Sequence, residues 1–451
     1  MGFSCWTDIS SRRHAEGRRK PASWRGSTVV SSAQPEADGP SGGQYEQYEQ
    51  YGQYGQQGQL RGLRVVEFAH VVAGPLAGSL LADQGADVVH VEPPGSGDAA
   101  RAMGPRREGH PLWFKVAGRN KRSVTLDLRQ EAGREVAHRL VAWADVVIVT
   151  LRNGRLRAWE LDWPAVHRIN PRAVLLQISG FGATSAQADA PGFGKVGEAR
   201  SGVVHLTGFP GGPPVHTGFS HGDAVTGLMG AYAVLAALHR RDRDPGFDGE
   251  WIDLALFEPL FRLVEWQVIT HDQLGTVPER AGNQLAVAPA AVINTYRSRD
   301  GEWITVTSAT LRSVRNVARL LGLDEDEFAT AEQQYAGRSR LDEGLRDWVA
   351  GRGADECLEA FARAEVVASR VFSAADIAAD PVYAERADLV TVDDADLGPV
   401  RMQAALPHFR QRPGHVWRTG PALGQDNRLV YREWLGLGED ELAELERNDV
   451  V

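Results

Sequence analysis

The stretch RVVEFAHVVAGPLAGSLLADQGADVVHVE, residues 64–92, sets the fold class of this chain. It opens with a β-rich run at 64–69, continues with apolar residues at helical spacing over 74–86, and closes with a second apolar run at 87–92. The sequence Pro-Pro-Gly that begins at Pro93 stops this second run. A strand, a helix and another strand in this order predict a parallel β–α–β unit.

The same alternation continues further along the chain. Apolar runs at 123–128, 145–150 and 173–179 predict more strands, and helices are expected at 130–143 and from near Asp223 onward. Strands that are apolar along their whole length indicate a doubly wound α/β fold, in which helices cover both faces of a parallel sheet. Ligands of such folds bind at the carboxyl ends of the strands. No G-x-G-x-x-G motif follows the first strand, which argues against a nicotinamide or flavin cofactor.

A second kind of pattern begins after the long helix. Runs at 291–296 and 303–307 predict an antiparallel hairpin, and helical stretches follow at 311–321 and 342–362. These elements indicate a smaller α+β domain. The expected division of the chain is a large doubly wound domain at 60–254, a linker helix at 255–280, a small α+β domain at 281–375 and a C-terminal segment at 376–451 that returns to the large domain.

The first 59 residues have a different composition from the rest of the chain. Residues 44–59 form a Gln/Tyr/Gly repeat with no aliphatic side chain to bury, so the segment 1–59 is expected to be a disordered low-complexity tail. The part before the repeat lacks the continuous apolar run of a secretory signal. We interpret 1–59 as a dispensable tail or the product of an early start codon, with an interaction arm as the alternative.

The composition excludes several function classes. The formal net charge is -10 and no basic block occurs in the globular part, which argues against nucleic-acid binding. No apolar run is long enough to cross a bilayer. Cys5 and Cys357 are the only cysteines, and they form neither a disulfide framework nor a Cys/His cluster that would bind a metal. A reducing cytoplasm is therefore the expected location.

Asp223 is the carboxylate whose position in the sequence most strongly suggests a role in catalysis. The dipeptide Gly222-Asp223 stands just before the helical run 224–240, where an aspartate commonly caps the helix with its side chain. A second interpretation is compatible with the first. A carboxylate at a helix N-terminus is held ionised by the helix dipole, the neighbouring glycine leaves room for a substrate, and the ionised group can act as a nucleophile.

Several short segments follow one another in the order and spacing of a known family. They are Leu60–Glu67, Gly85–Gly95, Asn120–Ser123, Asn170–Arg172, Ile178–Gly182, Gly222–Gly227 and Pro421–Asp426. On these segments the sequence from Leu60 to Val451 resembles the family III CoA-transferases, the CaiB/BaiF group that includes formyl-CoA transferase and carnitine CoA-transferase. Each segment is weak by itself, whereas their order and spacing together are specific. The resemblance implies an interlocked homodimer in which the large domain binds CoA.

The resemblance also implies a chemistry for Asp223. In this family the aspartate attacks the acyl-CoA carbonyl, and the released thiolate converts the mixed anhydride into an aspartyl-CoA thioester, which the acceptor carboxylate then attacks. Every intermediate keeps the activation of the thioester, so neither ATP nor a metal is required. The implied partners are an acyl-CoA and a carboxylic acid, with no permanently bound cofactor. The sequence does not identify either substrate.

The binding residues carry over by position. The resemblance places CoA against Val72, Ala73, Leu126, Arg129, Arg152, Phe193 and Lys195, and a substrate loop at Gly282 and Asn283. An arginine such as Arg152 can pair with a phosphate, although a solvated surface arginine is an equally good interpretation.

Two departures from the family leave alternatives open. Gly194 stands where many members have an acidic residue, which keeps a non-catalytic CoA-binding homologue as one alternative. Phe193 stands where the racemase branch, similar to α-methylacyl-CoA racemase, has a base histidine. Proton exchange at the α-carbon needs two bases, so the alternative of an acyl-CoA racemase or isomerase is disfavoured. His221 could line the pocket, but a structural histidine is the simpler interpretation.

Overall fold

The computed structural model describes residues 58–451. The expected disordered tail at 1–59 therefore lies almost entirely outside the described residues. Within them, no helix is both long enough and apolar enough to span a bilayer.

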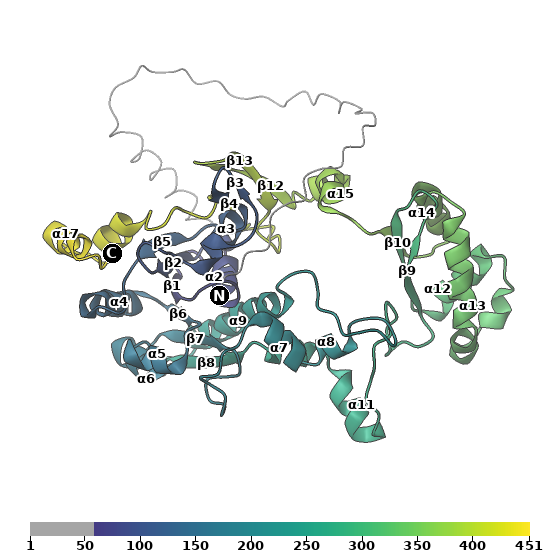
Figure 1. Cartoon of the computed structure of the whole chain (residues 1–451), viewed down its shortest axis with the longest axis horizontal. Coiled ribbons are helices and arrows are strands. Elements are labelled where there is room, and N and C mark those ends of the chain that lie inside the picture. Colours follow the sequence, from purple (N-terminus) through teal and green to yellow (C-terminus); the bar gives the residue numbers. More distant parts are fainter. Residues whose placement is uncertain (1–57) are drawn as a thin grey trace, which may run out of the picture. The chain divides into compact units, whose positions relative to one another are not determined.

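The central element is a six-stranded sheet with the order β5-β2-β1-β6-β7-β8, in which every neighbouring pair is parallel (Figure 1). Its strands are β1 (Arg64–Phe68), β2 (Asp87–Glu92), β5 (Arg122–Thr125), β6 (Val146–Val149), β7 (Val174–Ser179) and β8 (Glu250–Ala255). The prediction of an α/β fold with a parallel central sheet is confirmed. The chain runs outward from β1 to β2 and β5, and then returns to place β6 on the other side of β1.

Two hydrophobic cores cover the two faces of this sheet. Val66 and Phe68 of β1 belong to one core, together with α4 (Glu131–Trp143), whereas Val65 belongs to the other, together with α2 (Ala73–Asp83) and α9 (His221–Arg241). Successive side chains of a strand point to opposite faces. Because both faces are buried, the strands read as continuous apolar runs instead of alternating ones.

A separate three-stranded antiparallel sheet, β11-β10-β9, has its own core. It consists of β9 (Val292–Arg297), β10 (Trp303–Ser308) and β11 (Ala368–Arg370), and it packs with α12 (Leu311–Leu320), α13 (Ala331–Ala350) and α14 (Ala354–Arg363). The expected hairpin is present. Helix α13 begins eleven residues earlier than the pattern indicated, because Thr330 and Gln333 form a capping box at its start.

The C-terminal segment packs on the edge of the central sheet at β5. The Asp426 carboxylate accepts the Ser123 N–H at 2.9 Å, and the Tyr431 hydroxyl donates to the Thr125 carbonyl at 2.7 Å. The Asp127 N–H donates to the carbonyl of Val450, which belongs to the same core as α4. These contacts occupy the edge that a seventh strand would otherwise extend.

The remaining described elements are shorter. They are the 3-10 helices Ala99–Ala102 and Glu325–Phe328, β3 (Arg106–Arg107), β4 (His110–Pro111), α3 (Leu112–Ala117), α5 (Asn153–Ala158), α6 (Trp163–Ile169), α7 (Gly194–Arg200), α8 (Val203–Leu206), α10 (Glu258–Leu263), α11 (Trp266–Leu274), α15 (Ala374–Ala379), α16 (Pro381–Glu385), β12 (Leu389–Asp394), β13 (Gly398–Gln403), the π-helix Leu429–Trp434 and α17 (Glu439–Arg447). Residues 255–280, expected as a single linker helix, hold the two helices α10 and α11.

Candidate active site

A cavity of about 270 Å³ opens at the carboxyl ends of β1, β2, β5 and β6. We call it the switch-point cavity, because the chain reverses its direction of winding between β1 and β6. Its lining includes Phe68, His70, Glu92, Leu126, Arg129 and Trp159. The position is the one at which doubly wound folds bind ligands.

The predicted CoA-contacting residues are divided around this cavity. Leu126 and Arg129 line it, and the Arg129 guanidinium is held by two contacts with Asp127 at 2.8 and 2.9 Å. Arg152 is exposed just before α5 and is not part of the lining, whereas Arg155, one helical turn later, is. The Arg155 guanidinium lies 5.2 Å from the centre of the Trp159 ring, so a cation and an aromatic face meet at this cavity.

A second and larger cavity, of about 720 Å³, lies along α2 between α3 and the start of α9. We call it the α2–α9 cavity, and its lining includes Val71, Val72, Trp113, Arg119, Phe219 and Ala224. The lining is largely apolar. The Arg119 guanidinium is already engaged, because it contacts both carboxylate oxygens of Asp83 and the Gln403 carbonyl.

The loop between β1 and α2 separates the two cavities. His70 lines the switch-point cavity, and Val71 and Val72 line the α2–α9 cavity. Val71 has a φ of 70°, a left-handed conformation that is costly for a β-branched residue. Its N–H lies 3.0 and 3.1 Å from the two carboxylate oxygens of Asp98, which hold the loop in this conformation.

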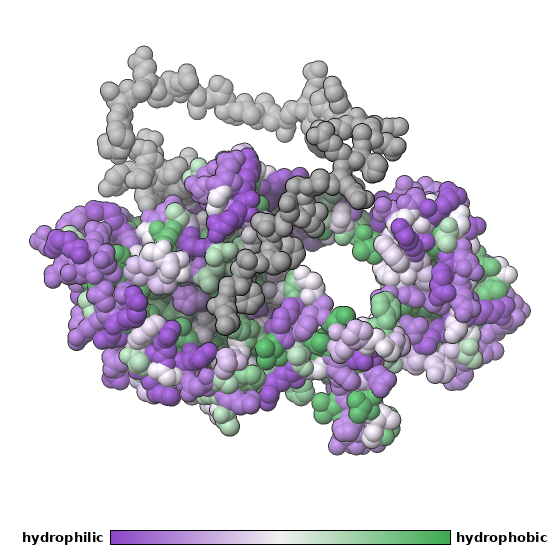
Figure 2. Space-filling view, in the orientation of Figure 1, coloured by the Kyte–Doolittle hydropathy of each residue, from purple (hydrophilic) through white to green (hydrophobic). Residues whose placement is uncertain are grey.

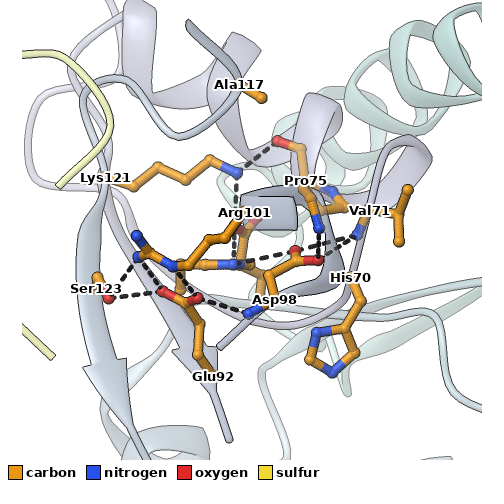
Figure 3. Close-up of polar contacts among 12 residues, drawn as sticks. His70, Val71, Pro75, Glu92, Asp98, Arg101, Ala117, Lys121 and Ser123 are labelled. Atoms are coloured by element: carbon orange, nitrogen blue, oxygen red, sulfur yellow. Dashed lines mark hydrogen bonds and ion pairs between the residues drawn. The ribbon is translucent and has the colours of Figure 1, made fainter. Parts of the chain in front are cut away.

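Asp98 belongs to a buried cluster of charged groups beneath this loop (Figure 3). The cluster, which we call the balanced cluster, contains Glu67, Glu92 and Asp98 as carboxylates and His90, Arg101 and Lys121 as bases. Figure 3 shows Asp98 directed at the Val71 backbone and Lys121 reaching the Pro75 carbonyl, a contact of 2.6 Å. The cluster therefore supports both ends of the loop.

The charges of the balanced cluster compensate one another. His90 lies between Glu67 and Asp98, with nitrogen–oxygen distances of 2.7 and 3.3 Å. Burial alone would lower the pKa of His90, but these two carboxylates raise it to about 9. Burial alone would raise the pKa of Asp98, but the His90 ring and the Ala100 N–H lower it to about 2. His90 is consequently protonated and Asp98 ionised at neutral pH, and these two form an ion pair in a cluster of three acidic and three basic side chains.

Asp223 lies in the first turn of α9, and the structure contradicts its interpretation as the helix cap. Ser220 occupies the cap position, and Asp223 is the third residue of the helix. Its carboxylate accepts no hydrogen bond from any residue within 58–451. Burial raises the pKa of Asp223 to about 6, the negative charge of Glu198 adds to the rise, and Lys195 opposes it. Burial and the charges of Glu198 and Lys195 therefore influence how readily Asp223 takes up a proton, in addition to the helix dipole.

Gly194 explains where the Asp223 carboxylate can lie. A Cβ atom on residue 194 would stand 2.0 Å from the nearer carboxylate oxygen of Asp223, closer than any real contact. Gly194, which stands where the resemblance implied an acidic residue, thus makes room for Asp223. From the sequence, Gly194 was interpreted as the loss of an acidic group. In the structure, the Asp223 carboxylate fills the space beside this glycine.

Other predicted residues lie elsewhere. The Lys195 amine contacts Glu198 and the carbonyls of Thr217 and Phe219, and neither Lys195 nor Phe193 lines the two cavities. Phe193 is 72% exposed, and Ala73 is buried at the start of α2.

The predicted substrate loop also stands away from both cavities within this chain. Gly282 has a φ of 64° and donates its N–H to the Gly208 carbonyl. The Asn283 amide donates to Asn294 and Thr295. Their roles stay predictions. In the described part of the chain, no group of three or more His, Cys, Asp or Glu residues is arranged to hold a metal ion.

Sequence reasoning missed Asp98, His90, Glu198 and Trp159. The Gly-Asp pair at residues 97–98 was a usable signal, because a carboxylate after a Pro/Gly-rich turn often bonds a nearby backbone. Glu198 had no such signal, because glutamate is ordinary on a helix.

The comparisons with known proteins agree with this architecture. Residues 60–427 match the family model described as CoA-transferase family III. The chain is 37% identical over 395 residues to a succinyl-CoA–D-citramalate CoA-transferase of Chloroflexus aurantiacus, covering 86% of this chain and 97% of the relative. It is 28% identical to a formyl-CoA:oxalate CoA-transferase of Streptomyces avermitilis, covering 87% and 99%.

A solved structure of a family member has a similar fold. The CAIB/BAIF family protein from Brucella suis superposes with a TM-score of 0.74 at 32% identity, covering 84% of this chain and 100% of the other. Together with the match over residues 60–427, these likenesses show that the chain belongs to CoA-transferase family III and is a CoA-transferase.

Proposed function

We propose that this enzyme moves CoA from an acyl-CoA donor to a carboxylic acid through an aspartyl-CoA thioester on Asp223. One observation carries the proposal: a partly buried carboxylate without a hydrogen-bond partner among the described residues stands at the start of α9, where neighbouring Ser220 and Ala224 line the α2–α9 cavity. The Asp223 carboxylate is neither fully buried nor held by a hydrogen bond from residues 58–451, so it is free to meet a substrate.

The proposed steps conserve the activation of the thioester. An ionised Asp223 oxygen attacks the acyl carbonyl, the carbon–sulfur bond breaks, and an acyl–aspartyl anhydride and the CoA thiolate result. The thiolate then attacks the Asp223 carbonyl and releases the donor carboxylate, which leaves CoA on the enzyme. The acceptor carboxylate attacks this thioester and forms a second anhydride, from which the thiolate takes up the new acyl group.

The raised pKa of Asp223 suits this role. With a pKa of about 6, roughly nine-tenths of the group is ionised at pH 7. No residue within 58–451 donates a hydrogen bond to the ionised form, so its charge is available for bond formation. A carboxylate saturated with hydrogen bonds would be a poorer nucleophile, because those bonds must weaken as its charge is consumed.

We propose that CoA binds across both cavities. Arg129, Arg155 and the Trp159 face offer phosphate and base contacts for its nucleotide end at the switch-point cavity. The pantetheine arm would pass the loop at Val71 and Val72, which bring the thioester to the start of α9. The α2–α9 cavity would then receive the acyl group.

The names of the relatives guide the choice of substrates. Relatives at 37% and 33% identity are named for the transfer of CoA from succinyl-CoA to D-citramalate or L-malate. We propose succinyl-CoA as donor and a small hydroxy-dicarboxylic acid as acceptor. A screen of acyl-CoA esters against carboxylic acids, with products identified by mass, would test this choice. Transfer only to monocarboxylic acids would refute it.

We also propose that the enzyme is a homodimer. Apolar side chains of α9, α10 and α11 are left uncovered, with 60–71% of Leu228, Tyr232, Leu263, Ile269 and Leu274 exposed. Figure 2 shows apolar residues at the surface around α11. Such patches are typical of subunit interfaces. A second copy would cover them and could bring its Gly282–Asn283 loop to the site. A monomeric mass by light scattering at micromolar concentration would contradict this.

The decisive experiment uses Asp223→Asn, which removes the nucleophile while keeping its shape. Wild-type enzyme incubated with succinyl-CoA should carry covalent CoA by intact mass, and hydroxylamine should convert Asp223 to a hydroxamate that peptide mapping locates. Asp223→Asn should show neither product. Glu250→Gln, which alters an exposed carboxylate paired with Arg240, should behave as wild type. Covalent CoA on Asp223→Asn, or on another residue of the wild type, would refute the proposal.

A further inference from the structure

Glu198 on α7 is a buried carboxylate to which the proposed mechanism gives no role. Its side chain is only 1% exposed, which is unusual for a glutamate unless its charge is paired. It bonds to the backbone of Gly222, next to Asp223, and its negative charge acts on Asp223. The contacts of Glu198 show which parts of the site depend on it.

One carboxylate oxygen of Glu198 fixes the start of α9. It accepts the N–H of Gly222 at 3.0 Å, and Gly222 immediately precedes Asp223. The two helix ends are in close contact there, because a Cβ atom on Gly222 would lie 2.7 Å from the Gly194 carbonyl oxygen. Glu198 and Gly194 both belong to α7, so this one helix both holds the backbone beside Asp223 and makes room for its carboxylate.

The other contacts of Glu198 organise the segment that precedes α9. The Lys195 amine lies 3.0 and 2.9 Å from the two Glu198 oxygens and also donates to the carbonyls of Thr217 and Phe219. The His216 ring lies 2.6 Å from Glu198. Phe219 lines the α2–α9 cavity. Through these bonds, Glu198 connects the wall of that cavity to the first turn of α9.

Two charged side chains of α7 act on Asp223. Glu198 raises its pKa and Lys195 lowers it. His216 contacts Glu198 from the preceding segment, and His221 of α9 packs against Phe219. Burial acts against ionised Glu198, but the Gly222 N–H, His216 and Lys195 lower its pKa, so it is negative whenever Asp223 titrates.

We propose that Glu198 is a positioning residue for Asp223, which ties α7, residues 216–219 and the first turn of α9 into one unit and places a fixed negative charge beside the nucleophile. The inference rests on the proposed role of Asp223. It goes further, because it adds the charges of one ion cluster to burial as a determinant of the proton affinity of Asp223, and it predicts opposite effects for Glu198 and Lys195.

The test measures how fast covalent CoA forms on the enzyme at different pH values. The measured quantity is the apparent second-order rate constant for the reaction of enzyme with acyl-CoA. The rate should rise with pH as Asp223 ionises, with a midpoint near the pKa of the free enzyme. Glu198→Gln keeps an oxygen for the Gly222 N–H but removes the charge, so the midpoint should fall by about half a pH unit or more. Lys195→Met removes the opposing charge, so the midpoint should rise.

Glu250→Gln serves as the matched control, because it neutralises a partly exposed carboxylate that pairs with Arg240 at the opposite end of α9 from Asp223, and it should leave the midpoint unchanged. A lower rate or a lower melting temperature with an unmoved midpoint in both variants would overturn the inference and leave Glu198 a purely structural residue. Should Glu198→Gln fail to fold, Lys195→Met decides the question: an upward shift supports the inference, and an unchanged midpoint refutes it.

The outcome is separable from that of the proposed function. Covalent CoA on Asp223→Asn would refute the nucleophile itself. Covalent CoA on wild type but not on Asp223→Asn, combined with unmoved midpoints in the two charge variants, would refute only the role of Glu198.

Discussion

The balanced cluster and the Asp223 site place a buried and a partly buried carboxylate in opposite electrostatic situations. Asp98 is paired with His90 and two backbone N–H groups, and its pKa is lowered to about 2. Asp223 has no hydrogen-bond partner among the described residues, and its pKa is raised to about 6. The comparison teaches that burial alone does not make a carboxylate reactive. What distinguishes the two is whether the surrounding groups already compensate its charge.

The largest effect is expected from Asp223→Asn. In the proposed mechanism every covalent step involves this carboxyl group, so the transfer rate should fall by about a thousandfold or more, measured as product formed per enzyme by mass spectrometry. The asparagine keeps the side-chain volume, so the secondary structure should be unchanged by circular dichroism. A residual rate within tenfold of wild type would show that Asp223 is not the nucleophile, and the contrast in reactivity between Asp223 and Asp98 would no longer hold.

The balanced cluster should respond to a charge change through stability. Lys121→Met removes a buried cation that is 1% exposed and contacts Glu67 at 2.5 Å. Glu67 would keep only the His90 ring, which it shares with Asp98, and the lost buried cation should destabilise the fold by about 3–5 kcal/mol, measured by urea unfolding. Arg240→Met breaks an exposed pair with Glu250 and should cost about 1 kcal/mol or less. Equal losses for the two variants would show that burial of the cluster is unimportant.

Gly194→Ala tests the packing around the Asp223 carboxylate. The added methyl group would lie 2.0 Å from an Asp223 oxygen, so the carboxylate must turn away from its position. Such a misplacement should reduce covalent CoA formation by about a hundredfold. Gly438→Ala, at a position with open space around it, should have no effect on the rate. An active Gly194→Ala enzyme would mean that Asp223 reacts from another orientation.

The smallest effect concerns the pH dependence of stability. The folded-state pKa of Asp223 is above its ordinary value of 3.8, so the folded state favours the protonated form. The stability gained below pH 3.8 is therefore lost as pH rises through about 6.

Asp223→Asn removes this dependence, and its melting temperature should exceed that of wild type by a few degrees at pH 7. The difference should shrink as pH falls toward 4. A difference that is constant with pH would mean that Asp223 is not destabilised when ionised. Differential scanning calorimetry of the two proteins side by side measures it.

Much of the architecture could be predicted because its causes are local. The apolar runs at 64–69 and 87–92 determined the parallel sheet, since a strand buried on both faces must be apolar at every position. The order of short motifs from Leu60 to Asp426 determined the family, and the helix beginning near Asp223 was recognisable from its apolar stripe.

The chemistry of individual side chains was decided only when distant segments came together. Arg155 reaches the switch-point cavity while Arg152 does not, because one helical turn separates them. The space for the Asp223 carboxylate depends on a glycine at 194, in another helix. Ionisation and hydrogen bonding depend on through-space distances of a few ångströms, which sequence spacing leaves unspecified until the chain has folded.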